Sequence, residues 1–161
     1  MHRVVQFVGH LTARVHPAEA TLVRRLLPAR AVELFDAMPV ADRRHGLDVA
    51  NRLLARGHDD RDLLAAALLH DAGKGHAMRL WHRVGGVLLE AFAPRLLRRL
   101  ASSHPASWRH GFHLYLHHEP ISADAALAVG CDPRVAAFIR GRTVATDAPL
   151  AAALRAADDA S

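Results

Sequence analysis

The sequence predicts an all-α protein with a single domain. Alanine, leucine and arginine dominate its 161 residues, and all three favour helix. No stretch shows the alternation of apolar and polar residues that is typical of a half-buried strand. Proline and glycine divide the chain into segments of about 10–18 residues, which is the length of ordinary helices. A chain of this length can bury a real core, so we expect these helices to form one globular unit.

Prolines delimit the predicted helices of the first third of the chain, because proline is accepted in a first turn and ends a preceding helix. The apolar residues of these segments recur at three- and four-residue steps. The segments are 3–15, in which the valines also permit a strand, 18–27, 29–38 and 39–56. Asp59 or Asp60 is expected to cap the helix that follows. We expect residues 1–38 to form a helical extension packed on the domain of residues 39–161.

The same signals divide the second half of the chain. Pro94 and Pro120 are each expected to begin a new helix, and Gly130 is expected to end one. Asp132 and Pro133 combine an N-cap with proline in the first turn, which indicates a further helix start. The predicted helices cover 78–92, 94–101, 108–118, 120–130, 133–141 and the alanine-rich end of the chain after 150. The basic run RLLRRL in the second of these is interpreted as a solvated face.

Charge and cysteine content limit the classes of protein. The formal net charge is +5, carried almost entirely by arginine, and Lys74 is the only lysine. The positive net charge is the single feature that would favour binding of nucleic acid, and we do not expect such binding on this basis. Cys131, the single cysteine, excludes an internal disulfide, fits a reducing cytoplasm and is expected in the core. No apolar run approaches the roughly 18–20 residues of a membrane-spanning helix, so we expect a soluble, cytoplasmic protein without a membrane partner.

The stretch LLAAALLHDAGKG, from Leu63 to Gly75, carries the most chemistry. His70 and Asp71 directly follow an apolar run, and burying an imidazole beside a carboxylate is costly unless something pairs with them. Neutral imidazole and carboxylate are ordinary ligands of a divalent metal ion. Lys74 shares their face of the last turn, so its amine can hold a phosphate oxygen or orient the carboxylate. Glycines 73 and 75 are expected to end the helix.

Two other segments offer further ligands. The helix of His45 and the helix of His70 should form an antiparallel hairpin, because only Gly57 and a few polar residues separate them. His45 lies about three turns before the hairpin end and His70 about two to three turns after it, so the two lie at similar depth. Asp158 and Asp159 follow an alanine-rich helix, where the helix dipole disfavours an acidic pair and a partner is therefore expected. The sequence contains no P-loop, dinucleotide-binding glycine motif, HExxH pair or serine elbow.

This arrangement resembles the HD-domain superfamily of metal-dependent phosphohydrolases. The resemblance covers about residues 40–161 and is strongest in AALLHDAGKG, which is close to the helix of that family that ends in His-Asp-x-Gly-Lys. DRRHGLDVANRLL looks like the first-histidine helix of the family, and LRAADDAS looks like its last-aspartate helix. The resemblance implies a helical bundle that binds a divalent metal, with Lys74 close by; Asp158 is preferred to Asp159 because the family ligand usually follows Ala directly. The implied ligands are His45, His70, Asp71 and Asp158.

Some members of that family carry a second metal on further histidines, and His117 and His118 in LHHEPISADAALAVG resemble the corresponding segment. A further histidine often follows an Ile-Arg-Arg-like sequence in those members. This chain has FIRGRT there, which argues against a complete two-metal site, and it lacks the Gly-Tyr-Pro signature of the cyclic-dinucleotide phosphodiesterases. His110, His113 and His117 recur at i, i+3 and i+7, and form either a separate metal site or, more simply, a polar helix face.

The function implied by the resemblance is metal-assisted hydrolysis of a nucleotide or another small phosphate ester. A set of nitrogen and oxygen ligands fits Mn, Fe, Co, Ni, Zn or Mg, and the sequence does not discriminate among these metals. Asp71 and Lys74 are the expected catalytic residues. The residues assigned to the substrate are Lys74, His82, Arg79, Arg83, Arg109 and Arg142. The alternative is a degenerate site in a nucleotide-sensing or partner-binding module, and the first forty residues form either an extra helical layer or the surface of a homodimer.

Overall fold

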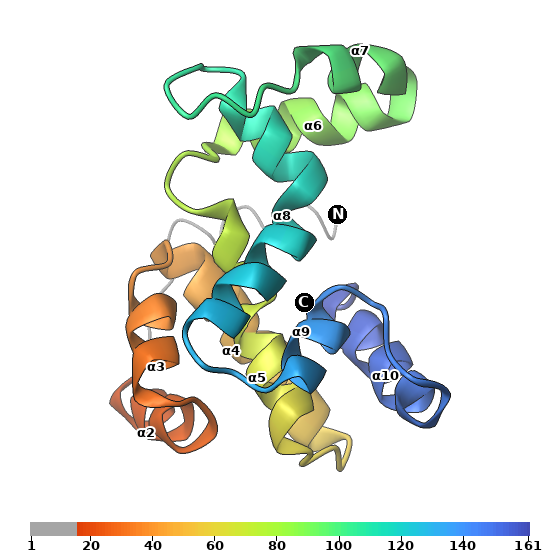
Figure 1. The fold of residues 1–161 in the computed structure, drawn as a ribbon. Coiled ribbons are helices and arrows are strands. Elements are labelled where there is room, and N and C mark those ends of the chain that lie inside the picture. The colour runs from red at the N-terminus through yellow and green to blue at the C-terminus, as the bar shows by residue number, and fades with distance from the viewer. Residues whose placement is uncertain (1–15) are drawn as a thin grey trace.

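The computed structural model describes residues 16–161 of the chain. Over this range the protein has nine α-helices, two 3-10 turns and no strand, which confirms the prediction of an all-α single domain (Figure 1). The helices are α2 Pro17–Leu26, α3 Ala29–Asp36, α4 Val40–Ala55, α5 Arg61–Leu69, α6 Leu80–Phe92, α7 Pro94–Leu100, α8 His110–Ala128, α9 Pro133–Ile139 and α10 Ala148–Asp158. The 3-10 turns are η1 Ala72–Lys74 and η2 Ala145–Asp147. The helix predicted over 3–15 lies outside the described residues.

Helix α5 is the centre of the fold. Every residue from Leu63 to Leu69 is buried, and a helix that is apolar on all sides needs neighbours on all sides. Helices α2, α4, α8, α9 and α10 supply them. Phe35 of α3 belongs to the same core. The stretch that carries His70 and Asp71 therefore begins in the most buried part of the molecule.

Helix boundaries follow the predicted signals at several points. Asp60 caps α5, because its carboxylate accepts hydrogen bonds at 3.0 Å from two backbone N–H groups of the first turn. Asp132 caps α9 in the same way with one bond of 2.8 Å. Gly57 and Gly130 have φ angles of +82° and +90°, the left-handed conformation that commonly ends a helix. These predictions are confirmed.

The structure corrects the prediction around Pro120. The two helices predicted over 108–118 and 120–130 are one continuous helix, α8, with Pro120 inside it. Proline cannot donate a backbone hydrogen bond to the carbonyl of Leu116 one turn earlier, which normally weakens a helix. Here α8 packs against η1, α5, α6, α7 and α9, so tertiary contacts along its length hold it together. The prediction of a break at Pro120 was wrong because it weighed only this local signal.

A second correction concerns the end of α5. The helix ends at Leu69, four residues before the first glycine that was expected to end it. Gly75 has a φ of +53°, but Gly73 lies inside the 3-10 turn and serves close packing. A Cβ atom on Gly73 would lie 2.6 Å from the carbonyl oxygen of His118 and 2.8 Å from the amide nitrogen of Ser122. The N–H of Gly73 also donates to Ser122 Oγ at 2.8 Å, so η1 sits directly on α8.

Gly46 has the corresponding role between α4 and α5. A Cβ atom at this position would lie 2.9 Å from the carbonyl oxygen of Leu68 and 3.1 Å from that of Ala67. Both are backbone atoms that cannot move aside as a flexible side chain would. The absence of a side chain here lets α4 approach α5 closely, directly beside His45.

Replacing Gly73 with alanine is expected to lower the free energy of unfolding by about 1–3 kcal/mol, the usual cost of forcing extra atoms into a packed site. The methyl group would collide with the backbone of α8, and the 3-10 turn would have to shift. Gly85→Ala is the matched control, because a Cβ atom there meets only the ring of Phe112 at 3.4 Å. Urea denaturation should show the loss for Gly73→Ala alone. Equal midpoints for the two variants would contradict this packing role.

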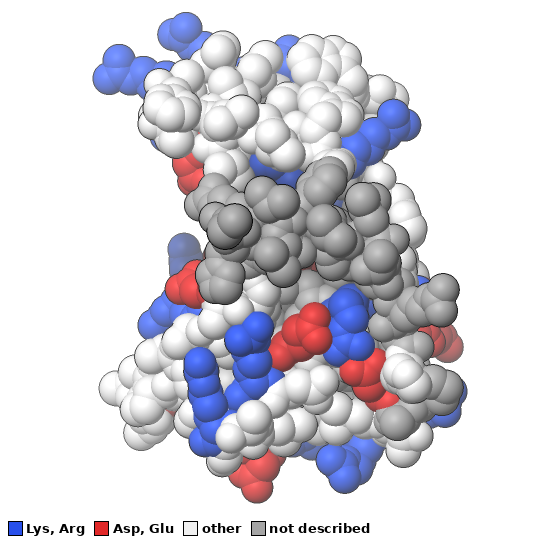
Figure 2. All heavy atoms as spheres, turned by 180° about the vertical axis from the view of Figure 1, so that it is seen from behind, with Lys and Arg blue, Asp and Glu red and all other residues white. Residues whose placement is uncertain are grey.

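The end of the molecule formed by α6 and α7 exposes much apolar surface. Figure 2 shows that this end is largely uncharged, with basic side chains at its margins. Its exposed apolar residues are Leu80, Trp81, Val84, Val87, Leu88, Phe92, Leu96 and Trp108. The arginines of the RLLRRL run are exposed, as expected for a solvated face. Among the described helices, none combines the length and apolar character needed to span a membrane.

Candidate metal centre

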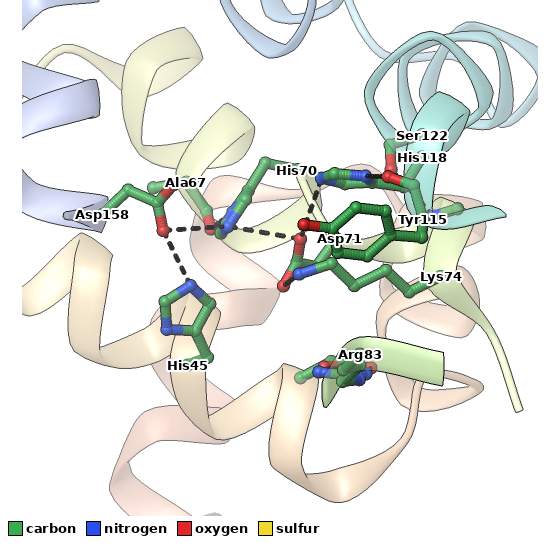
Figure 3. A network of polar contacts seen from close by, with 12 residues as sticks. His45, Ala67, His70, Asp71, Lys74, Arg83, Tyr115, His118, Ser122 and Asp158 are labelled. Atoms are coloured by element: carbon green, nitrogen blue, oxygen red, sulfur yellow. Dashed lines mark hydrogen bonds and ion pairs between the residues drawn. The ribbon is translucent and has the colours of Figure 1, made fainter. Parts of the chain in front are cut away.

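Three helices bring polar side chains to one place. His45 comes from the middle of α4, His70 from the end of α5 and Asp158 from the end of α10 (Figure 3). Each offers one potential ligand atom, and these three atoms lie within 4.8 Å of one another. The hairpin geometry expected for α4 and α5 therefore does place the two histidines side by side, with ring centroids 5.1 Å apart.

The ring of His70 is oriented by the backbone. Its Nδ1 lies 2.9 Å from the carbonyl oxygen of Ala67, and because a carbonyl can only accept, Nδ1 carries the proton. In the neutral ring, Nε2 then presents its lone pair to the cluster. That atom lies 3.5 Å from Asp158 Oδ1 and 3.6 Å from Asp71 Oδ1. A lone pair facing two carboxylate oxygens requires a cation or a proton between them.

Asp71 is buried and its two oxygens differ. The Lys74 amine donates to Oδ2 at 2.6 Å, whereas Oδ1 has no hydrogen-bond partner and faces the cluster. His118 approaches from α8, with Nε2 4.0 Å from Asp71 Oδ1. The Nδ1 atom of His118 is held by the carbonyl of Tyr115 at 3.0 Å, so its Nε2 is also turned toward the carboxylate. One oxygen of Asp71 is therefore paired with the Lys74 ammonium group, and the other is available to bind a metal ion.

The residues present fit a divalent metal ion. Two buried atoms of the cluster, His70 Nε2 and Asp71 Oδ1, have no hydrogen-bond partner, and such atoms are rare in folded proteins. Ligand atoms held about 2.1 Å from one ion in a tetrahedron lie about 3.4 Å apart. The 3.5 and 3.6 Å separations around His70 Nε2 match this spacing, whereas His45 Nε2 and Asp158 Oδ1 lie 2.8 Å apart in a direct hydrogen bond. The donor set that would hold the ion is the converging group of His45, His70 and Asp158, joined by Asp71 through Oδ1, which lies 3.6 Å from His70 Nε2.

The pKa values of the cluster reflect its crowding with carboxylates. Burial disfavours a charge on His70, but Asp71 and Asp158 outweigh this and raise the pKa of His70 to about 9. Burial also opposes ionisation of Asp71, yet the cations of His70 and Lys74 hold the pKa of this carboxyl well below its usual range. The hydrogen bond from His45 and the nearby charge of His70 overcome burial in the same way and hold the pKa of Asp158 low. In the metal-free protein, a proton on His70 therefore takes the place of the cation.

Metal binding at neutral pH is expected to release about one proton, because the ligand must be neutral imidazole. The raised pKa of His70, about 9 against an ordinary value of 6.5, means that metal affinity should rise with pH up to about pH 9. In the metal-free protein the same group stabilises the fold fully below pH 6.5, and this contribution is lost as the pH rises through 9. Calorimetric titration with Zn²⁺ in two buffers of different ionisation enthalpy measures the release. Proton release unchanged in His70→Ala would contradict the assignment.

The cluster opens into a cleft of about 420 Å³. Cationic and acidic side chains share its walls: the lining residues include Ala41, Asp42, Arg44, His45, Asp48, Asp71, Lys74, Arg83, Asp158, Asp159 and Ser161. Arg83 is fixed by the buried Asp42, whose two oxygens each lie 2.7 Å from one guanidinium nitrogen. Arg44 is held between Glu19 and Asp48, with contacts of 2.8 Å to each. The cleft thus combines His45, Asp71 and Asp158 with two arginines, Arg44 and Arg83, that are held by partners outside the ligand set. His70 lines a separate cavity of about 300 Å³.

Several residues predicted for the substrate lie elsewhere. His82 is buried between α6 and α8, where Nε2 donates to the carbonyl of Trp108 at 2.7 Å and Nδ1 accepts from the N–H of Arg79 at 3.1 Å. Arg109 donates to the backbone carbonyls of Arg99 and Leu100 and so anchors the loop before α8. The exposed side chains of Arg79, Arg142 and His117 do not line the cleft. Of the predicted arginines, the structure brings only Arg83 to it, whereas Lys74 lies in it as expected.

Sequence reasoning did not single out Asp42 or Arg44, although both line the cleft. Asp42 lies three residues before His45, a spacing that places the two side chains on the same face of α4. Arg44 and Asp48 are four residues apart, which is the usual spacing of a helical ion pair. These spacings were available signals. The partnership of Asp42 with Arg83, 41 residues later, carries no local signal.

Comparison of the chain with protein-family models, with curated proteins and with solved structures gives no match.

Proposed function

We propose that the protein is a metal-dependent phosphohydrolase of the HD type, acting on a nucleotide or another small phosphate ester. The observation that carries the proposal is the pair of buried, unpartnered atoms, His70 Nε2 and Asp71 Oδ1, which face each other beside Asp158. Without an ion, the only bridge that the described residues offer between these atoms is a proton on His70 across 3.6 Å, which is longer than a hydrogen bond, whereas a divalent ion satisfies both atoms together. The order of the ligands along the chain agrees with the motifs quoted above for that superfamily.

The surroundings of the cluster suit a phosphate group. Lys74, Arg44 and Arg83 line the same cleft as three of the four proposed ligands and provide the cationic donors that bind phosphate oxygens. A cleft of about 420 Å³ falls in the range of about 300–1,000 Å³ that small ligands occupy. The proposal of a small phosphate ester therefore follows from the size of the cleft and the charges on its walls.

The side chains around the ion have distinct roles in this proposal. When bound, a divalent ion supplies Lewis-acid polarisation of the phosphoryl oxygen and lowers the pKa of water. Lys74 fixes Asp71 through Oδ2, so that Oδ1 stays directed at the centre. The same amine keeps Asp71 ionised, since it contributes to the depressed pKa of that carboxyl. Arg83 and Arg44 are held in place by carboxylates, so they meet the substrate without being reordered.

The test is metal analysis of the native protein combined with a panel of nucleotides, phosphodiesters and phosphomonoesters, each assayed with Mn²⁺, Fe²⁺, Co²⁺, Ni²⁺, Zn²⁺ and Mg²⁺. The expected result is metal-dependent release of phosphate or nucleoside monophosphate from at least one substrate. Absence of bound metal together with absence of turnover for every ion would overturn the proposal. Thermal stabilisation by a nucleotide without any turnover would identify the alternative, a binding module built on the same cleft.

A further inference from the structure

We propose that His113 and His117, on the outer face of α8, form a second transition-metal site that is separate from the candidate centre. The two residues are four apart on one helix, the spacing that lets two imidazoles bind one ion in the HExxH motif. Their ring centroids are 4.6 Å apart. Nothing in the proposed hydrolytic function uses this pair.

The geometry of the helix supports two-point binding. His110 continues the row one turn earlier, with its ring stacked on that of His113 at 5.7 Å and an interplanar angle of 21°. His117 is exposed, and His113 and His110 are partly exposed, so an ion from solvent reaches the row without opening the fold. Side chains three and four residues apart lie on the same face of a helix, so the row forms one continuous strip of imidazole.

The neighbouring His118 shows that this strip and the candidate centre are separate. Consecutive residues point about 100° apart around a helix. His118 is turned inward, with Nε2 4.0 Å from Asp71 Oδ1, while the ring of His117 packs against His113. Helix α8 therefore directs His118 toward the buried cluster and places His113 and His117 on a different face.

The chemistry of the row favours late transition metals. It offers imidazole nitrogens, and such ligands suit Cu²⁺, Ni²⁺ and Zn²⁺ rather than the oxygen-preferring Mg²⁺ or Ca²⁺. Partial burial and the neighbouring rings of His117 and His110 lower the pKa of His113, so its imidazole is more readily neutral, as a metal ligand must be. Two protein ligands leave the remaining coordination positions to water, so the site should be open and exchangeable.

Metal binding at this point would also reinforce α8. The carbonyl of Leu116 lies one turn before Pro120, which has no N–H to donate to it. An ion held by His113 and His117 would clamp the turn that contains Leu116. We therefore expect added Ni²⁺ to raise the melting temperature, because a ligand that binds only the folded chain stabilises it.

The experiment uses the full chain carrying the substitution His70→Ala, which removes a ligand of the candidate centre. Any ion that this variant still binds is therefore expected at the row on α8, whether or not the proposed hydrolytic function is correct. Titration with Ni²⁺ and Cu²⁺ should still show one bound ion, with two nitrogen ligands in the electron paramagnetic resonance spectrum of the Cu²⁺ form. Adding His113→Gln and His117→Gln should lower the affinity by at least about 100-fold and abolish the rise in melting temperature. His104→Gln, in an exposed loop, is the matched control and should change neither.

Circular dichroism of each variant, including the His70→Ala background, verifies that the helices are retained. Retention is expected for the further substitutions because His117 and His104 are exposed and His113 is partly exposed. Absence of any bound ion in the His70→Ala background would overturn the proposal. Binding that survives the double substitution would overturn it as well. Loss of the site in the His104→Gln control would place the ion elsewhere and have the same consequence.

Discussion

Replacing Asp71 with asparagine is expected to lower the affinity of the candidate centre for Zn²⁺ or Mn²⁺ by more than about 100-fold, since loss of even an outer partner of a metal ligand costs 10–100-fold. The amide has nearly the same shape as the carboxylate, but it removes the charge that Oδ1 offers to the ion and Oδ2 offers to Lys74. Metal-dependent hydrolysis should fall with the metal content. Calorimetric titration and elemental analysis of the purified variant measure the effect.

Asp159→Asn is the matched control for this variant. Asp159 lies next to a proposed ligand and lines the same cleft, but it is exposed, whereas Asp71 is buried with Oδ1 3.6 Å from His70 Nε2. It should bind metal like the parent protein. Equal metal affinity in Asp71→Asn and the parent would show that Asp71 is not a ligand. Equal losses in the two variants would show that only the general charge of the cleft matters.

Replacing Arg83 with methionine is expected to destabilise the protein by about 3–5 kcal/mol, the usual result of removing one partner of a buried ion pair. Asp42 is fully buried, and Arg83 donates to both of its oxygens at 2.7 Å. Without the guanidinium, the carboxylate would be left buried without this partner. Urea denaturation measures the loss, and Arg79→Met, at an exposed position near the start of α6, is the control.

The double variant Asp42→Leu with Arg83→Met decides between two explanations of such a loss. If the cost comes from an uncompensated buried charge, removing both partners should restore most of the stability, because apolar replacements of buried ion pairs are often neutral. If the double variant is no more stable than Arg83→Met, the cost comes from lost packing and the explanation by charge is wrong. Hydrolytic activity should stay low in the double variant, since Arg83 also lines the cleft.

The sequence predicted most of the helices because proline, glycine and capping aspartates mark their ends locally. Asp60 and Asp132 cap the helices that follow them, and Gly57 and Gly130 end the preceding ones. The break expected at Pro120 was the main error in the helices. A local signal predicted it, and packing of α8 along its whole length prevailed over that signal.

In the candidate site, too, some residues could be placed from local signals and others only from the tertiary fold. The helical hairpin places His45 beside His70 because its geometry follows from a short connection, and Asp158 joins them from the end of the chain. The arginines could not be placed, since nothing local tells which of many exposed guanidinium groups turns toward the cleft. Arg109 anchors a loop instead, and Asp42 with Arg83 forms a pair that only the tertiary fold brings together.

Two of the glycines that lack room for a side chain, Gly46 and Gly73, lie beside proposed ligands and define a sequence pattern for recognising other chains with this candidate centre. Gly46 directly follows His45, and Gly73 lies two residues after Asp71. Each glycine that permits a close backbone contact is therefore a near neighbour of a proposed ligand in the sequence. A distant chain that keeps the histidines and aspartates but carries a larger residue at either glycine must separate its helices and spread its ligands. We expect the pattern His-Gly followed by His-Asp-x-Gly to distinguish chains that hold an ion from those that retain only the histidines.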